Sequence, residues 1–189
     1  MTKKEKNGSD QLTIGELIKD VIIAVVIALV IIQFVKPTIV MESSMEPNFY
    51  QGDYLFVYRM AYKFSATPEK GDVIIFKSDL QTEKGDKKLL IKRVVGVPGD
   101  EISIHNGKVL INGKEDLQDY TAEGMTVGDI DVTVPEGELF CMGDNRTVSL
   151  DSRSPEVGCV SYDRVVGRVF FRAFPFNQIG IIHNPYEEE

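Results

Sequence analysis

The sequence predicts a mostly β, antiparallel domain that follows a single N-terminal transmembrane helix. Three observations carry this prediction. One long apolar run lies between residues 17 and 35, and short β-type runs separated by turn residues follow Pro37. Neither an alternation of strands and helices nor a repeat of fixed period is present. The 189 residues are enough for one such domain beside the helix.

The apolar run has the length of a membrane span. Residues 17–35 would form a helix of about 28 Å, close to the roughly 30 Å of a bilayer's hydrocarbon core. Every residue from Val21 to Ile32 is apolar, so a soluble helix would have no face for water. A cleavable signal peptide would have a shorter apolar run followed by a cleavage site with small residues, and the segment QFVKPTIV contains no such site. We expect an uncleaved anchor that ends before Pro37.

Flanking charges predict the orientation of this anchor. Four lysines precede the apolar core, namely Lys3, Lys4, Lys6 and Lys19, whereas only Lys36 closely follows it. The positive-inside rule then places the N-terminus in the cytoplasm. The predicted organisation is a cytoplasmic tail over residues 1–16, a transmembrane helix over 17–35 and an extracytoplasmic domain over 36–189. The predicted location is the cell membrane, with the chain crossing it once.

The remainder of the chain contains eight candidate strands. They cover residues 38–41, 53–60, 72–78, 88–97, 101–107, 108–113, 138–143 and 165–174. Asn106-Gly107 between two of them predicts a tight hairpin. Residues 116–132 have no clear pattern and are expected to form a long excursion, and residues 187–189 a solvated tail.

Composition excludes several functions. The net charge of −8 leaves no basic surface for nucleic acid, so no nucleic-acid partner is expected. Cys141 and Cys159 do not have zinc spacing, and they could be two buried apolar side chains or a disulfide. The two histidines, His105 and His183, are predicted to be surface or packing residues. Because nucleotide-binding and metalloprotease motifs are also missing, we expect no metal and no cofactor.

A serine and a lysine provide the remaining route to nucleophilic catalysis. A serine needs a base, and a lysine can act as one when burial favours its neutral form. Lys92 lies in the apolar run LLIKRVVGV, where strand alternation directs Lys92 and Arg93 to opposite faces. One of them could therefore point inward, and only the lysine could be neutral there. The alternative is an edge strand with two solvated charges.

Three segments resemble the motifs of one enzyme family. Residues 44–47, SMEP, resemble the SMxP motif of type I signal peptidases, and residues 92–100, KRVVGVPGD, resemble the lysine box. Residues 143–153, GDNRTVSLDSR, are similar to the third box, GDNRxxSxDSR. SMxP alone is a weak signal, but the three motifs in this order after an anchor are very specific. Taken with their spacing and the preceding anchor, the resemblance extends over most of residues 13–172.

The resemblance implies a membrane-bound serine endopeptidase that removes signal peptides from exported preproteins. It implies a β-sheet or barrel-like ectodomain and a substrate bound as an extended strand. The implied partners are signal-peptide-bearing preproteins and the lipid bilayer. The resemblance assigns Ser44 as the nucleophile, Lys92 as its general base, Ser149 as the hydroxyl that orients the lysine amine, Asp151 and Arg153 as a supporting ion pair, and Met45 as part of a substrate pocket. Asp144, Asn145 and Arg146 are expected to build a turn.

The sequence also departs from the family pattern. Some relatives have a serine hydroxyl two residues before the nucleophile that helps to hold the oxyanion, but Glu42 occupies this position here. An ionised carboxylate cannot donate a hydrogen bond, so the Ser44 backbone N–H is one candidate donor. Alternatively, the Glu42 side chain points away and a different group donates. Asn48 stands where many relatives have threonine. An inactive, membrane-anchored scaffold that binds preproteins, or a self-cleaving repressor of related fold, would be the alternatives.

Overall fold

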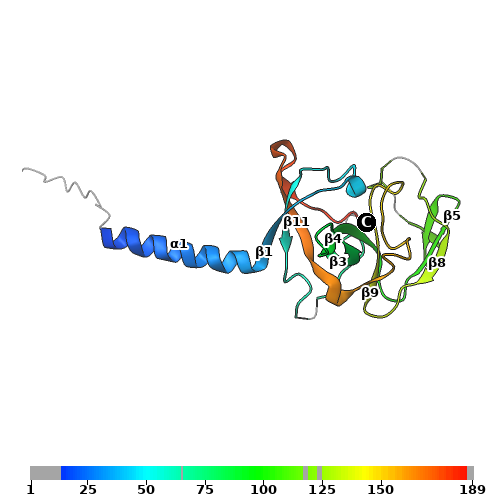
Figure 1. Ribbon diagram of the computed structural model, residues 1–189, viewed down its shortest axis with the longest axis horizontal. Coiled ribbons are helices and arrows are strands. Elements are labelled where there is room, and N and C mark those ends of the chain that lie inside the picture. Colours follow the sequence, from blue (N-terminus) through cyan, green and yellow to red (C-terminus); the bar gives the residue numbers. More distant parts are fainter. Residues whose placement is uncertain (1–13, 65, 117–118, 123–124, 187–189) are drawn as a thin grey trace, which may run out of the picture. The chain divides into compact units, whose positions relative to one another are not determined.

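The computed structural model describes residues 14–64, 66–116, 119–122 and 125–186 (Figure 1). The chain divides into two compact units, Met1–Phe34 and Val35–Glu189. Most of the predicted cytoplasmic tail and the predicted solvated tail at 187–189 lie outside the described residues.

The described part of the first unit is one helix, α1, over Ile14–Phe34. It has no buried residue, and its 21 residues are long and apolar enough to cross a membrane. The helix begins before the predicted Leu17 and ends one residue before the predicted Val35. Pro37 does not end it directly, because the chain has already entered a strand at Val35.

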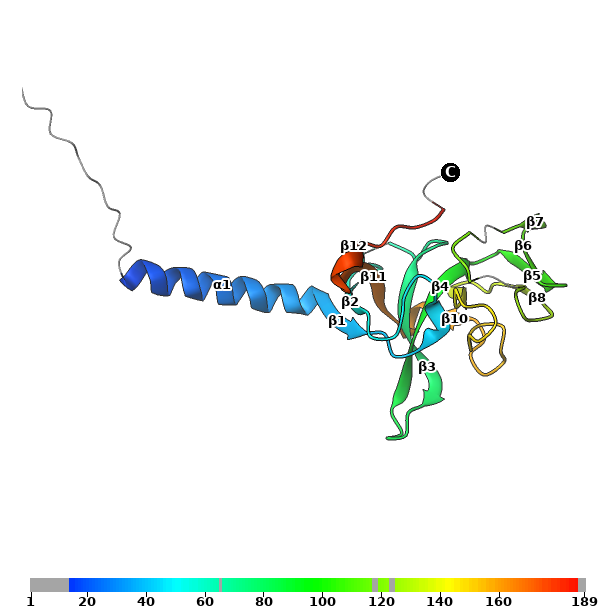
Figure 2. The same cartoon turned by 90° about the horizontal axis from the view of Figure 1, so that it is seen from above.

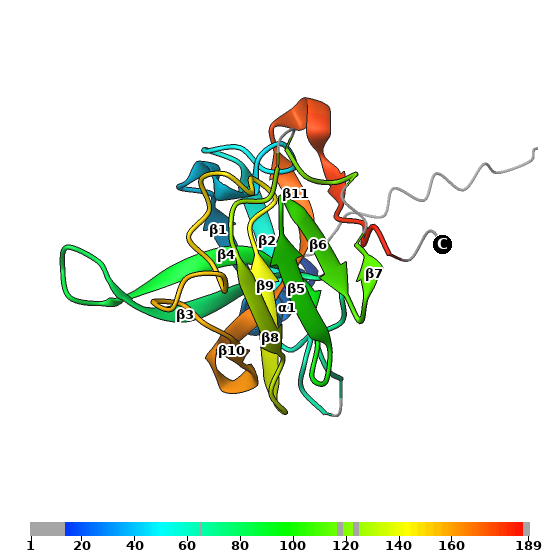
Figure 3. The same cartoon turned by 90° about the vertical axis from the view of Figure 1, so that its right-hand side faces the viewer.

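The second unit is antiparallel and mostly β, as predicted. Its larger sheet has the order β1-β2-β11-β3-β4-β9-β10, with β12 paired to β11. The strands are β1 Val35–Ile39, β2 Tyr54–Tyr58, β3 Val73–Gln81, β4 Lys87–Gly96, β9 Glu138–Met142, β10 Val160–Ser161, β11 Val165–Phe174 and β12 Gly180–Ile181. The hairpin of β3 and β4 projects from the domain in Figures 2 and 3.

The larger sheet is open, so the expected barrel-like form is not a closed barrel. The order of the described strands ends at β1 on one side and at β10 on the other. Pro37 lies in β1 and lacks a backbone N–H, which suits it to an edge strand.

A smaller sheet has the order β7-β6-β5-β8. Its strands are β5 Glu101–His105, β6 Lys108–Ile111, β7 Lys114–Glu115 and β8 Ile130–Thr133, which lie together in Figure 2. Asn106 and Gly107 both have positive φ, at 50° and 81°, and form the tight hairpin predicted between β5 and β6.

Each predicted strand overlaps an observed one, but four observed strands were not predicted. β7, β10 and β12 have only two residues each, too few to give a pattern. β8 lies in the segment expected to be an irregular excursion, and it forms because β5 offers an unpaired edge. The described residues also form three short 3-10 helices, at Ser43–Met45, Tyr162–Arg164 and Phe176–Gln178.

The core lies on both faces of the larger sheet. On β3, Val73 and Ile75 pack into one buried cluster, whereas Ile74 and Phe76 pack into another. This explains why the strand reads as a continuous apolar run instead of an alternating one. β4 is also buried on both faces towards its end, and this places Lys92 deep in the domain.

Candidate active site

Ser44 lies in the 3-10 turn that follows β1, and its side chain is buried. The turn is attached to the third motif through two hydrogen bonds. The Asn145 backbone N–H donates to the Ser44 carbonyl at 3.0 Å, and the Asn145 side-chain amide donates to the Ser43 carbonyl at 3.3 Å. The first and third motifs, about a hundred residues apart in sequence, therefore meet here.

Lys92 reaches Ser44 from the neighbouring strand β4. Its Nζ donates to Ser44 Oγ at 2.7 Å and to the Ile91 carbonyl at 2.9 Å. The side chain is only 1% exposed. Serine hydroxyl and lysine amine are thus both buried and in direct hydrogen-bond contact, the arrangement that proton transfer between them requires.

Burial gives this lysine an unusual pKa. Because desolvation penalises the ammonium form, it lowers the pKa of Lys92 from 10.5 to about 8, although the charges of Asp151 and Glu42 act in the opposite direction. A substantial fraction of the amine is neutral at pH 8, and a neutral amine can accept a proton from a hydroxyl.

Arg93 is buried as well, which differs from the expectation of one inward and one outward side chain. Both faces of β4 are covered at this point, so alternation leads both residues into the interior. Arg93 donates to both carboxylate oxygens of Asp144, at 2.9 and 2.7 Å, and its guanidinium lies 4.6 Å from the centre of the Tyr120 ring. Burial disfavours the charge, but Asp144 holds the pKa of Arg93 above its ordinary value.

Asp144 and Arg146 therefore do more than build a turn. Asp144 is fully buried and also accepts a hydrogen bond of 2.8 Å from the Asn48 amide. Asn48 follows the SMEP motif, so this bond connects the nucleophile segment to the buried Arg93–Asp144 ion pair. Arg146 is buried too, and it donates to the Gly143 carbonyl and to the Tyr120 hydroxyl.

Asp151 and Arg153 form the expected ion pair, and it is buried. Arg153 Nη2 and Asp151 Oδ2 are 2.8 Å apart, and the two side chains are 8% and 0% exposed. The segment is a series of turns, not an extended chain, so their proximity does not come from strand alternation. Although burial opposes ionisation, Arg153 keeps the pKa of Asp151 below its ordinary value. Asp151 also accepts the Gly143 backbone N–H at 3.0 Å.

Ser149 lies next to Gly143 and is partly buried, with its Oγ atom shielded from solvent. Its Oγ has no hydrogen-bond partner among the described residues, so the predicted bond to the Lys92 amine is not formed in this structure. A Cβ on Gly143 would collide with both Ser149 Oγ and the Ser44 carbonyl. Glycine at this position is what allows the three backbone segments to approach so closely.

Met45 is fully buried in the core beside Val40 and Phe49. Val40 itself lines an apolar cleft of about 440 Å³ beside Ser44 and Lys92. Met45 and Val40 belong to the same buried cluster, and the predicted role of Met45 in a substrate pocket remains a prediction.

The cleft was not predicted from the sequence. It runs between the segment that leads to Ser44 and the part of β4 that leads to Lys92. Ile39 and Leu89 are exposed apolar side chains on its two walls. Apolar residues shortly before both Ser44 and Lys92 in the sequence are the signal from which the cleft could have been predicted. The residues of the walls are Thr38, Ile39, Val40, Met41 and Glu42 on one side, and Lys87, Lys88, Leu89, Leu90 and Ile91 on the other, and Ile75 and Thr82 also line the cleft.

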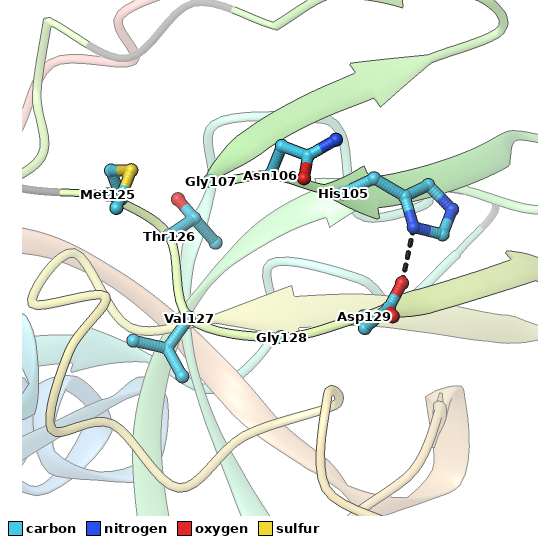
Figure 4. Close-up of a pocket in the computed structure, with 8 residues that line it drawn as sticks. All are labelled: His105, Asn106, Gly107, Met125, Thr126, Val127, Gly128 and Asp129. Carbon is cyan, nitrogen blue, oxygen red and sulfur yellow. Dashed lines mark ion pairs between the residues drawn. The ribbon is translucent and has the colours of Figure 1, made fainter.

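A second pocket, of about 720 Å³, is lined by residues 105–107 and 125–129 and shares no residue with the cleft (Figure 4). His105 is in it, forms an ion pair with Asp129 and contacts Asp131 at 3.0 Å. The side chain is partly exposed and contacts neither Ser44 nor Lys92, and His183 is exposed. The described residues contain no group of three or more side chains that could hold a metal ion, and both cysteines are free.

Comparison with known proteins identifies the family. The family described as "Signal peptidase, peptidase S26" matches residues 14–174. The chain is 36% identical to signal peptidase I of Bacillus licheniformis over 93% of its own length and 97% of that protein. It is 33% identical to the probable signal peptidase I-2 of Synechocystis sp., over the whole of this chain and 86% of the other.

The chain is thus a peptidase, a hydrolase of peptide bonds. It belongs to the signal peptidase family, peptidase S26. A crystal structure of a signal peptidase I from Enterococcus faecalis V583 is 28% identical in sequence, with a TM-score of 0.45 over 55% of this chain and 97% of that one. The single N-terminal apolar helix fits a membrane-anchored member of this family.

Proposed function

We propose that this protein is a membrane-anchored serine endopeptidase that removes signal peptides from exported preproteins with a Ser44/Lys92 dyad. The observation that carries the proposal is the buried 2.7 Å contact between Lys92 Nζ and Ser44 Oγ, at a lysine whose pKa is lowered to about 8. Family membership supports the removal of signal peptides as the reaction.

In the proposed mechanism, the neutral Lys92 amine accepts the hydroxyl proton of Ser44 while Ser44 Oγ attacks the scissile carbonyl carbon. The Ser44 backbone N–H would donate to the oxyanion that forms. The ammonium of Lys92 then gives its proton to the leaving amine, and the mature protein departs. A water molecule, deprotonated by the same amine, hydrolyses the acyl ester and restores Ser44.

The supporting residues act on this dyad in different ways. The Ser149 hydroxyl, which is buried and without a partner among the described residues, would bond to the Lys92 amine and direct its lone pair towards Ser44. The Asp151–Arg153 ion pair would hold the loop that carries Gly143 and Ser149. Neither Asp151 nor Arg153 takes part in proton transfer in this scheme.

The apolar cleft is the proposed binding site for the end of the signal peptide. β4 pairs with β3 over residues 87–93, and β9 joins its other edge only from Arg93 onward. The backbone of residues 87–92 is therefore open on that edge among the described strands, and an extended peptide could add to it. The mostly apolar lining of the cleft suits apolar side chains near the cut.

The proposed arrangement has α1 in the lipid bilayer, residues 1–16 in the cytoplasm and residues 36–189 outside it, in agreement with the lysines that precede the helix. Cleavage would then take place where exported chains leave the membrane.

The proposal is tested with the full-length protein in mild detergent. The substrate is a preprotein with an alanine-rich cleavage site, and the product is analysed by N-terminal sequencing. We expect one cut, after a small residue, at the end of the signal peptide. Cuts scattered through the preprotein, or no cut at all, would contradict the proposal.

A further inference from the structure

One ion pair of this domain lies at the candidate active site without any role in the proposed mechanism. Glu42 and Lys88 are in contact through their side-chain charges. Glu42 is two residues before Ser44, and Lys88 is four residues before Lys92. Their side chains are 46% and 37% exposed, so the pair lies at the surface and not in the core.

The two residues belong to opposite walls of the apolar cleft. Glu42 ends the wall of residues 38–42, and Lys88 lies in the wall of residues 87–91. An ion pair between them has to cross the space that separates the walls. It therefore links the two walls, from the residue two before Ser44 on one wall to the residue four before Lys92 on the other.

Both walls also present unpaired backbone. β1 is an edge strand that pairs with β2 alone, and residues 87–92 of β4 pair with β3 alone among the described strands. An extended peptide that hydrogen-bonds to either edge would run along the cleft and meet the Glu42–Lys88 contact.

We propose that the Glu42–Lys88 ion pair is a gate across the substrate cleft, and that these two residues thereby set the affinity for the peptide. This inference rests on the proposed function and goes beyond it. An entering peptide strand separates the two charges, so part of its binding free energy is used to break the pair. Removal of either charge leaves the cleft open and strengthens peptide binding.

Glu42 and Lys88 also act on the pKa of Lys92, and this effect can be distinguished from the effect of the gate on peptide binding. The Glu42 carboxylate raises the pKa of Lys92, whereas the Lys88 ammonium lowers it. Neutralising Glu42 and neutralising Lys88 should therefore shift the pH–rate profile in opposite directions. The gate predicts instead that both changes shift KM in the same direction.

The experiment measures kcat and KM of the full-length protein in detergent at pH 8, with a fluorogenic peptide that contains an alanine-rich cleavage site. Glu42→Gln and Lys88→Gln are each expected to lower KM by about two- to five-fold, the range for a partly exposed ion pair. The charge exchange Glu42→Lys with Lys88→Glu restores the pair and should return KM to the wild-type value.

The matched control is Lys108→Gln, which removes the exposed Lys108–Glu115 ion pair of the smaller sheet. Its KM should equal that of the wild type. High salt screens the gate, so raising the salt concentration should lower the KM of the wild type and the control but not that of Glu42→Gln or Lys88→Gln.

Three results would overturn the gate. They are an unchanged or raised KM in either single variant, KM changes of opposite sign in the two variants, and a charge exchange that fails to restore KM while each single variant lowers it. If the wild type cuts the peptide and the variants behave like it, only the gate is refuted. If the wild type cuts no peptide or preprotein, the proposed function is refuted and the gate with it.

Discussion

Replacement of Lys92 by methionine should make the protein more stable at neutral pH. In the folded state burial lowers the pKa of Lys92 from 10.5 to about 8, and at about 1.36 kcal/mol per pKa unit this corresponds to roughly 3 kcal/mol. Below pH 8 the folded protein bears the whole of this cost. Methionine fills a similar volume without a charge, and the lost hydrogen bond to Ser44 offsets about 1 kcal/mol. We expect Lys92→Met to raise the free energy of unfolding by about 2 kcal/mol at pH 7.

The stability difference between Lys92→Met and the wild type should depend on pH. Between pH 8 and 10.5 the unfolded chain binds a proton at Lys92 that the folded protein has released, so the stability of the wild type rises with pH in this window. The advantage of Lys92→Met should therefore shrink from pH 8 and be lost near pH 10.5. Urea unfolding in mild detergent, followed by tyrosine fluorescence, measures this. Lys77→Met, on the exposed side of β3, is the control. The reasoning would be refuted if Lys92→Met had a lower free energy of unfolding than the wild type at pH 7 and the difference were the same at pH 10.

Three further predictions concern the site. The logarithm of kcat/KM should rise with pH and level off near pH 8, because the amine of Lys92 must be neutral to accept the proton of Ser44. Asp151→Asn should move this break to lower pH, because the Asp151 charge raises the pKa of Lys92. A profile that does not change with pH would contradict this role of Lys92. Gly143→Ala should reduce kcat by about a hundred-fold, since its Cβ collides with Ser149 Oγ and the Ser44 carbonyl. The control Gly180→Ala, at a position with open space and no positive φ, should leave kcat unchanged. Asp144→Ala leaves the buried Arg93 charge unpaired and should lower the free energy of unfolding by about 3–5 kcal/mol in a urea titration, and a loss below about 1 kcal/mol would count against a buried pair.

Local sequence patterns were sufficient for most of the architecture. The continuous apolar run of residues 21–32 predicted α1, and Asn106-Gly107 predicted the hairpin of β5 and β6. The strand β8 could not be predicted in this way. Its residues have little pattern of their own, and its conformation depends on pairing with β5, which lies about thirty residues earlier.

The candidate site was predictable to a similar extent. The apolar neighbours of Lys92 indicated its burial, but nothing near Arg93 indicated that Asp144, fifty-one residues later, would bury it as well. The contact between Ser44 and Lys92 was inferred from the resemblance alone. The cleft and the Glu42–Lys88 contact depend on how two distant segments face one another, so local patterns contain no information about them.

The most direct test of the central claim is cleavage of one preprotein by the wild type, Ser44→Ala and Lys92→Ala, with Lys77→Ala as a control on the exposed side of β3. The account predicts that the wild type and Lys77→Ala cut after the same small residue, and that Ser44→Ala and Lys92→Ala, folded as judged by circular dichroism, do not cut. Cleavage by either of these two variants at the wild-type rate would contradict the Ser44/Lys92 dyad.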